Sequence, residues 1–272
     1  MTLLPAMEEL HKIQCTLQDL ISNSLELINE YGDVIALPKK EKLQDEVVHD
    51  FIFFCFTKGT KSLMAIDSLL TEAYIEDAKI LARSAYESYL NGAYILEHPE
   101  NVNFLVAAKV GTYFGHYKHP VSKKGKKIVS KMILPSTKEI VDIKVTLKMM
   151  AEGTYNKNDA NVHENLYSFF SEFAHIHMMA SGSYRTGDNA RYTTETSTDG
   201  IYATLFLCLY IAWLLFDMVI TYLYKNTKNL DEIINFRNSI KSYLGEILEQ
   251  IEFVKELELL KLNMKNRLKG TQ

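Results

Sequence analysis

Hydrophobic residues along this chain recur at steps of three and four positions, the spacing of one face of an α-helix. The pattern is clearest between Ala73 and Glu97, where an apolar stripe and a polar stripe run side by side. Apolar and aromatic residues flank the polar stripe, so we expect it to face another helix rather than solvent. The apolar stripe consists of Ile75, Ala78, Leu81, Ala82, Ala85, Tyr89 and Ala93, and the polar stripe of Glu76, Arg83, Glu87 and Asn91.

The same periodicity predicts helices before and after this segment. Gly59 is the expected break or bend in the preceding helix. Pro99 ends the helix over 73–97, because its ring disfavours a helical residue before it. The final helix repeats apolar residues among Glu and Lys, as a long exposed or dimer-forming helix does. Besides 73–97, the predicted helices span residues 6–31, 41–70, 101–117, 136–151, 162–180, 201–224 and 231–268.

Residues 201–224 are almost wholly apolar and are interrupted by a single charge, Asp217. The stretch is long enough to cross a bilayer. One such segment with a carboxylate inside it fits the central helix of a bundle better, so we do not expect a membrane protein. The sequence therefore predicts an all-α fold, a multi-helix bundle of about seven to nine helices around one long central apolar helix.

Composition and charge favour one domain of a cytoplasmic protein. The 272 residues contain no Pro/Gly/Ser-rich linker, so we expect a single domain over 1–272, with its core in 40–225 and a C-terminal helix in 228–268 that could form a homodimer. A net charge of −4 gives no overall attraction to nucleic acid, so such binding requires a local basic patch. Three scattered cysteines and a start without signal-peptide features, MTLLPAMEEL, indicate the cytoplasm.

Polar residues on two of the predicted helices form the first candidate site. Arg83 and Glu87 lie four residues apart on one helix face, where they either pair with each other or hold the guanidinium ready for an anion. Ser171 and His175 share a face of a later, Phe-rich helix, and Glu172 lies on the same face. The candidate catalytic residues are therefore Arg83, Glu87, Ser171 and His175.

Two polar loops offer contacts for an anionic substrate. The stretch 118–131 is the most basic of the chain and is either solvated or in contact with phosphates. Residues 181–200 exceed the usual length of a connection in a compact domain, and their arginines and tyrosines supply donors and stacking faces. The candidate substrate-binding residues in these loops are Lys123, Lys124, Lys126, Lys127, Tyr184 and Arg185.

A metal site is a weaker alternative. Three segments have the E-x-x-H spacing that places a Glu and a His on one metal, as in di-iron helical bundles. These short matches occur in a Glu-rich chain, so we expect no metal and no other cofactor. The three pairs are Glu8 with His11, Glu46 with His49, and Glu172 with His175, of which the last two could form such a set with Glu87 and a Glu such as Glu26 or Glu30.

Residues 58–96, followed by SEFAH at 171–175, resemble an uncharacterised bacterial helical family, domain of unknown function 5677. The resemblance covers about residues 40–180 and brings no settled activity. Lys61 and Asp77, within this stretch, complete the candidate substrate-binding set. The residues that match the family's motif are Asp77-Ala78 for an acidic-Ala pair, Arg83 and Glu87 for an Arg-x-x-x-Glu, and Ser171 and His175 for a later Ser-x-x-x-His.

The layout is also distantly similar to HEPN helical domains, many of which are metal-independent ribonucleases of phage-defence and toxin systems. Those domains use an Arg and a His within one short R-x(4–6)-H run, usually paired across a dimer. This chain has no such run, so the corresponding pair would be Arg83 and His175 from different helices. The similarity implies an endoribonuclease in which Arg83 holds the scissile phosphate, His175 moves a proton from the ribose hydroxyl, and the 118–131 lysines guide the RNA backbone.

The same residues suit two functions other than catalysis. A non-catalytic module could use them to recognise a phosphate or carboxylate ligand. A partner or immunity subunit could use the ion pair only to fix the register of its helices. We therefore expect RNA or another anionic ligand as a partner, and the sequence leaves open whether the protein is an enzyme.

Overall fold

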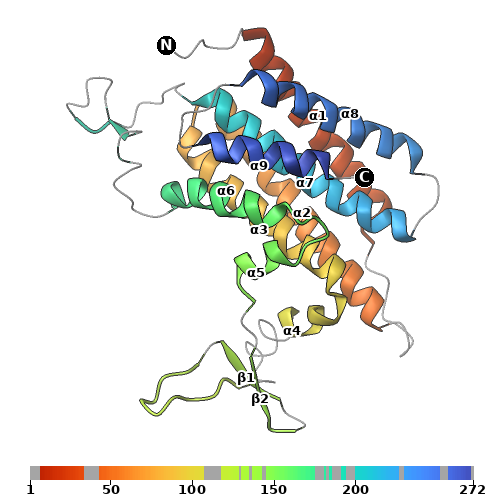
Figure 1. Ribbon diagram of the computed structural model, residues 1–272, viewed down its shortest axis with the longest axis vertical. Coiled ribbons are helices and arrows are strands. Elements are labelled where there is room, and N and C mark those ends of the chain that lie inside the picture. Colours follow the sequence, from red (N-terminus) through yellow and green to blue (C-terminus); the bar gives the residue numbers. More distant parts are fainter. Residues whose placement is uncertain are drawn as a thin grey trace.

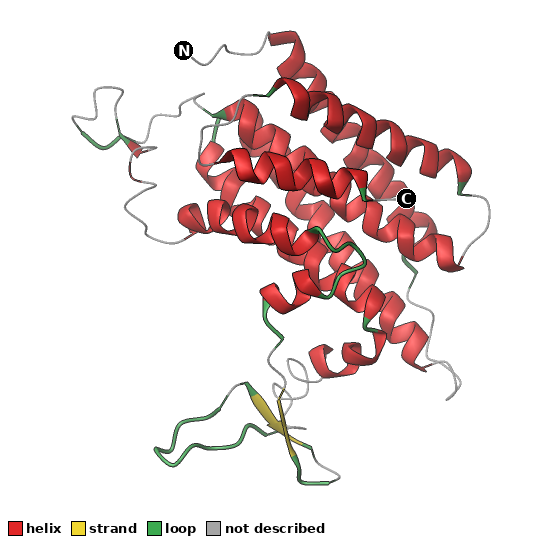
Figure 2. Ribbon diagram, viewed as in Figure 1, coloured by secondary structure: helices red, strands yellow, loops and turns green. Residues whose placement is uncertain are grey.

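The protein is described from a computed structural model, shown in Figure 1. Most of its described residues are helical, as Figure 2 shows, which confirms the predicted all-α class. The described residues are 7–33, 43–106, 118–128, 130–134, 137–142, 145–174, 181, 184–185, 191–193, 200–226, 230–251 and 257–270. Their nine α-helices are α1 (Met7–Tyr31), α2 (Leu43–Thr71), α3 (Ile75–Glu97), α4 (Val102–Val106), α5 (Leu147–Glu152), α6 (Asp159–Ala174), α7 (Ile201–Asn226), α8 (Asp231–Gln250) and α9 (Glu258–Lys269).

The long apolar helix α7 lies in the middle of the bundle (Figure 1). Every residue from Thr204 to Ile220 is buried, and α7 packs against α1, α2, α3 and α8. By length and composition, Ile201–Lys225 could cross a membrane, but the rest of the protein covers nearly all of it. α7 is therefore the core helix that the sequence predicts, and burial of its apolar surface drives the assembly of the bundle.

Helix α2 is continuous, which corrects the predicted break at Gly59. A Cβ atom added at Gly59 would lie 2.6 Å from Cδ1 of Leu215 on α7. The missing side chain lets α2 and α7 approach closely, so this glycine serves packing rather than a turn. The chain reverses later, near Ala73, whose φ of 59° is in the left-handed region.

Helix α3 has the buried apolar stripe that the sequence predicts, although Leu81 is only half-buried. It ends at Glu97, directly before His98 and Pro99, and the short 3-10 helix η1 (Pro99–Asn101) leads into α4. α3 packs against α2 on one side and against α6 on another, with α7 beneath it. Its polar stripe consequently runs along the boundary between neighbouring helices.

The C-terminal region forms two helices, α8 and α9, instead of the single helix predicted over 231–268. α8 stops at Ile251, whose ψ of 129° is extended rather than helical. α9 packs against α6 and α8, and its Leu260, Met264 and Arg267 are buried. The packing of α9 against α6 and α8 buries these side chains, whereas a straight continuation of α8 would carry them away from the core.

A strand of a small sheet lies within the helix predicted over 136–151, which corrects that part of the prediction. Strands β1 (Lys131–Ile133) and β2 (Ile140–Asp142) pair antiparallel, with Met132 opposite Val141. The β-branched residues of β2 favour an extended chain. Helix α5 begins only at Leu147, where the hydroxyl of Thr146 accepts a hydrogen bond from the Met149 amide at 3.2 Å.

Two other predicted helices are described only in part. The helix predicted over 101–117 corresponds to α4, and residues 107–117 lie outside the described residues. The helix predicted over 162–180 corresponds to α6, and residues 175–180 also lie outside them.

Two phenylalanines on α2 provide a matched test of the packing. Phe56 is fully buried, whereas the side chain of Phe54, two residues earlier, lies on the surface. We expect Phe56→Ala to lower the free energy of unfolding by about 3–5 kcal/mol, because it leaves a cavity in the core. Phe54→Ala should change it by roughly 0.5 kcal/mol or less. Chemical denaturation of both variants measures the difference, and equal losses would contradict this arrangement of α2.

Candidate functional site

Helices α3 and α6 lie side by side and antiparallel, and their polar and aromatic side chains form an interhelical seam. At one end of the seam, the hydroxyl of Tyr89 on α3 donates to Oδ2 of Asp159 on α6 at 2.5 Å. Toward the other end, Nη2 of Arg83 on α3 donates to the hydroxyl of Tyr167 on α6 at 2.5 Å. Arg83 of the polar stripe of α3 thus faces another helix, as the sequence pattern predicts.

Arg83 is held within this seam from two directions. Its Nε donates to Oε1 of Glu87 at 3.0 Å, which forms the intrahelical ion pair, one of the two alternatives left open by the sequence. Its Cζ also lies 4.7 Å from the centre of the Tyr167 ring. The side chain of Arg83 is 18% exposed and that of Glu87 33%, so the pair sits at the rim of the helix packing.

Ser171 lies one turn beyond Tyr167 on α6. Its hydroxyl donates to the Tyr167 carbonyl at 2.6 Å, a bond within the helix. His175, the fourth predicted member of the site, lies outside the described residues. The structure therefore brings Arg83 and Glu87 to the turn of α6 that precedes Ser171, and it gives no position for the histidine.

A different histidine, His163, lies inside the seam, and the sequence analysis missed it. Its ring stacks on Tyr86 with centroids 6.0 Å apart and tilts toward Tyr167 at 5.0 Å. Burial lowers the pKa of His163, and the nearby Glu152 and Glu87 only partly offset this effect. The imidazole is consequently neutral at pH 7. Its position four residues before Tyr167, on the same helix face, is the sequence signal that could have identified it.

Lys79 occupies the seam one turn before Arg83. Its ammonium lies 4.0 Å from the centre of the Phe173 ring and 5.8 Å from that of Phe169. Burial lowers the pKa of Lys79, while Glu76 raises it. Because aromatic faces attract a cation, these two rings offset part of the cost of burying the ammonium.

A fully buried arginine, Arg267 of α9, lies at the inner end of the seam. Its Nε donates to Asp159 Oδ1 at 2.6 Å, and its Nη2 donates to Tyr89, Tyr155 and Asp217 at 3.1–3.2 Å. Burial lowers the pKa of Arg267, but these four groups together raise it by more, so the guanidinium stays charged. Arg267 thereby connects α3, α6, α7 and α9 in one buried network.

Both carboxylates of this network have further partners. Oδ2 of Asp159 accepts from the hydroxyls of Tyr89 and Thr154, at 2.5 and 2.6 Å. Oδ1 of Asp217 lies 3.4 Å from Nη1 of Arg237 on α8. Two arginines, the buried Arg267 and the half-buried Arg237, thus balance the charges of the two aspartates.

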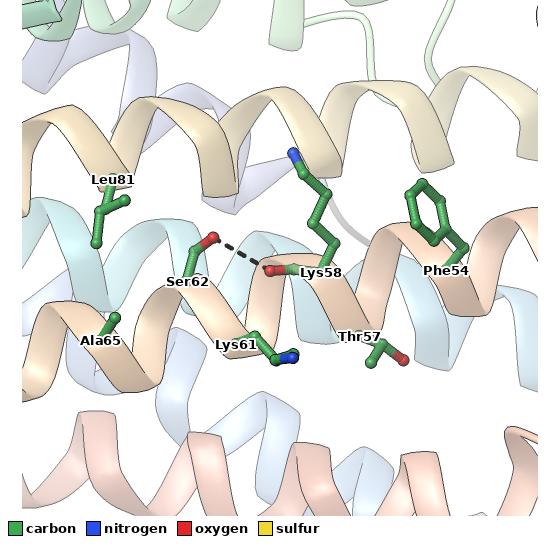
Figure 3. Close-up of a pocket in the computed structure, with 7 residues that line it drawn as sticks. All are labelled: Phe54, Thr57, Lys58, Lys61, Ser62, Ala65 and Leu81. Carbon is green, nitrogen blue, oxygen red and sulfur yellow. Dashed lines mark hydrogen bonds between the residues drawn. The ribbon is translucent and has the colours of Figure 1, made fainter. Parts of the chain in front are cut away.

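A surface groove of about 490 Å³ lies between α2 and α3. Figure 3 shows Phe54 and Lys58 on neighbouring turns of α2, both directed toward α3, with Leu81 pointing back from α3. The ammonium of Lys58 donates to Ser84 Oγ on α3 at 3.1 Å. Lys61, a predicted substrate-binding residue, follows one turn later, and Thr57, Ser62 and Ala65 complete the lining.

The model of DUF5677, a family of unknown function, matches residues 49–192. This stretch is more than half of the chain and contains all of α3 and α6. The chain belongs to DUF5677. No curated protein and no solved structure matches it. The resemblance noted in the sequence is thereby confirmed at the level of the family, and the distant similarity to HEPN domains stays a prediction.

The predicted basic loop of this DUF5677 protein is an exposed hairpin. Its tip is a tight turn in which the Ser122 amide donates to the Lys126 carbonyl at 2.8 Å, and Gly125 has a φ of 74°. Figure 1 places the neighbouring strands β1 and β2 at one end of the molecule, away from α6 and α9. The four exposed lysines Lys123, Lys124, Lys126 and Lys127 are therefore presented apart from the seam.

The second predicted loop meets the other end of α3. Arg185 donates from Nη2 to the Tyr192 hydroxyl at 2.9 Å and lies over that ring at 4.6 Å. Burial raises the pKa of Tyr184, and the carboxylates of Glu76 and Asp77 raise it further, which places Tyr184 within electrostatic reach of the first turn of α3. The predicted substrate-binding residues of DUF5677 thus lie in separate places rather than on one surface.

The candidate metal pairs do not converge in the described part of the chain, which holds no group of three or more metal-ligating side chains. His49 Nδ1 lies 3.0 Å from the hydroxyl of Tyr222 on α7. His11 contacts Cys15 of its own helix at 3.6 Å. The third pair, Glu172 and His175, is described only for its glutamate.

The neutral His163 makes the stability of the protein depend on pH. Its unfolded pKa is near 6.5 and its folded pKa is lower, so below about pH 6.5 the unfolded chain takes up a proton that the folded chain does not. We expect the free energy of unfolding to fall between about pH 7.5 and 5.5, and His163→Phe to reduce that fall. Denaturation at several pH values tests this, with His98→Gln as a control outside the seam. If His163→Phe kept the wild-type dependence of stability on pH, His163 would not be the group responsible for it.

The buried network predicts strong coupling between Arg267 and its carboxylate partners. Arg267→Met should cost about 3–5 kcal/mol of stability, because two buried carboxylates lose their shared cation. Asp159→Asn should also destabilise, and the double variant should lose less than the sum of the two single losses. A double-mutant cycle by chemical denaturation measures this coupling, and additive losses would show that Arg267 and Asp159 do not interact.

Proposed function

We propose that this DUF5677 protein is an RNA-binding module whose ligand lies in the groove between α2 and α3. One observation carries the proposal: two lysines and an exposed phenylalanine line a single groove on the face of α2. A single-stranded nucleic acid is recognised by cations that contact its phosphates and by aromatic rings that stack on its bases. The groove offers both kinds of group within about two helical turns.

The electrostatics of the groove suit a polyanion. The whole chain has a net charge of −4, so attraction to RNA has to come from a local patch. Lys58 and Lys61 form such a patch, and both are exposed. The described bonds of Lys58, to Ser84 at 3.1 Å and to Ser88 at 3.5 Å, use two of the three donors of its ammonium and leave one for a phosphate.

Phe54 supports RNA over a small inorganic anion. Its side chain is 60% exposed, although the neighbouring aromatic residues of α2 are buried or half-buried. Apolar surface covered by a ligand gains hydrophobic free energy, so this exposed ring could stabilise a bound base. A base stacked on this ring would contribute about 1–3 kcal/mol to binding.

Binding is better supported than cleavage. An endoribonuclease built on Arg83 would need its guanidinium for the scissile phosphate, yet Nε and Nη2 are engaged by Glu87 and Tyr167. His163, the described histidine of the seam, is buried and neutral and so cannot reach a ribose hydroxyl without rearrangement. Cleavage by Arg83, Glu87, Ser171 and His175 therefore stays the second hypothesis.

The proposal is tested by fluorescence anisotropy with a labelled single-stranded uridine oligonucleotide. The double variant Lys58→Ala/Lys61→Ala should weaken binding and reduce the slope of log K against log salt by roughly 1–1.5, because two phosphate contacts are lost. Phe54→Ala should weaken binding by about tenfold or more without changing that slope. Lys157→Ala and Leu259→Ala, at exposed positions away from the groove, are the controls and should bind as the wild type does.

Two results would contradict this function. The first is the absence of RNA binding at low salt, and the second is equal affinity in the groove variants and the controls. Gel analysis of the same RNA after incubation separates binding from cleavage. We expect the RNA to be recovered at full length, and shortened products that disappear in Arg83→Ala would favour the ribonuclease instead.

A further inference from the structure

A second surface groove, of about 370 Å³, lies between α8 and α9. Its lining includes Lys241 from α8 and Lys265 and Lys269 from α9, together with one acidic residue, Glu249. Among the lining side chains, three cations and one anion sum to +2 in a protein whose net charge is −4. Burial lowers the pKa of Lys241, and the Asp217 carboxylate partly offsets this effect. The groove lies outside the residues that match DUF5677 and is formed by helices other than those of the RNA groove.

At Gly245, no side chain projects into this groove. This glycine lies inside α8, where glycine destabilises a helix relative to alanine. Its φ is not positive, and a Cβ atom added there would meet no described atom within 4 Å. Neither backbone conformation nor packing within the described chain requires glycine here, in contrast to Gly59. The space above Gly245 is available to an external group.

The chain itself shows which kind of group this space attracts. The carboxylate of Glu249 accepts from the ammonium of Lys265 at 2.8 Å across the groove. The bond to Lys265 and the charges of Lys265, Lys261 and Lys269 lower the pKa of Glu249. Glu249 thus acts as an internal anion in a field set by several lysines. A ligand of higher negative charge could displace it from Lys265.

We propose that the α8–α9 groove binds a small molecule that carries a chain of two or three phosphates. Lys241, Lys265 and Lys269 would contact the phosphates, and the opening above Gly245 would admit them. Ammonium groups bind phosphate as point charges, and a polyvalent anion matches several of them at once. The volume of this groove lies in the lower range of volumes found for small-molecule binding sites. A second copy of this chain is a poor occupant, since the same lysines would then face one another.

Isothermal titration calorimetry of the full chain with inorganic pyrophosphate and with ATP tests this site. We expect binding at low salt that weakens by about tenfold or more in Lys241→Ala/Lys265→Ala, because charge-assisted contacts are lost. Gly245→Leu should abolish binding by filling the opening, while its melting temperature stays at or above that of the wild type because leucine favours a helix. Glu249→Gln should bind more tightly, because it removes the competing carboxylate.

The outcomes distinguish a nucleotide from a bare phosphate chain as the ligand. They also test the α8–α9 groove independently of the α2–α3 groove. Tighter binding of ATP than of pyrophosphate identifies a nucleotide, and equal binding identifies the phosphate chain alone. Lys157→Ala is the charge control and should retain wild-type affinity. RNA binding should be unchanged in Gly245→Leu, so failure at one groove does not decide the other. The proposal would be overturned if neither pyrophosphate nor ATP gave a heat of binding at low salt, or if Gly245→Leu bound them with wild-type affinity.

Discussion

Two carboxylates in an apolar core impose the main constraint on this fold. Asp159 and Asp217 are each 1% exposed, and a buried charge without a partner is severely destabilising. The cation that satisfies both, Arg267, comes from the last helix of the chain. The region that matches DUF5677 contains Asp159 but ends well before Arg267. In this protein, therefore, the C-terminal helix completes the core of the family region. A buried ion pair is weak evidence for net stability, but it strongly specifies where α9 docks.

From this network, polar and aromatic contacts continue along α3 and α6 to the surface. Tyr89 bonds Asp159, the stacked rings of Tyr86 and His163 follow, and Arg83 and then Lys79 come next toward the start of α3. These contacts fix the register of the two helices, because a slip of one turn would separate every donor from its acceptor. They also leave the opposite edge of α3 free to form the groove with α2. The seam would therefore act as the rigid support of the proposed binding surface, a role that does not require it to perform chemistry.

Periodicity predicted the helices well where one face is apolar, as in α1 and α3, and a continuous apolar run identified α7. It failed where local preference and tertiary packing disagree. Gly59 carries the sequence signal of a break, but its role depends on Leu215, which lies far along the chain on α7. The pair of Arg83 and Glu87 was one of the alternatives the sequence offered, because their contact is local. Arg267 was not identified, since its partners lie 50 to 178 residues away in the sequence and no helical period connects them.

The position of Arg267 also relates the α8–α9 groove to the core. Lys265 and Lys269 of the groove flank Arg267 within the same two turns of α9. A ligand that bridges α8 and α9 binds the docked arrangement of α9 and not the detached one, so it stabilises docking by mass action. Docking in turn keeps Arg267 on Asp159, the residue that anchors α6 against α3. Occupancy of the C-terminal groove would therefore stabilise the seam that supports the α2–α3 surface, although the two grooves share no residue.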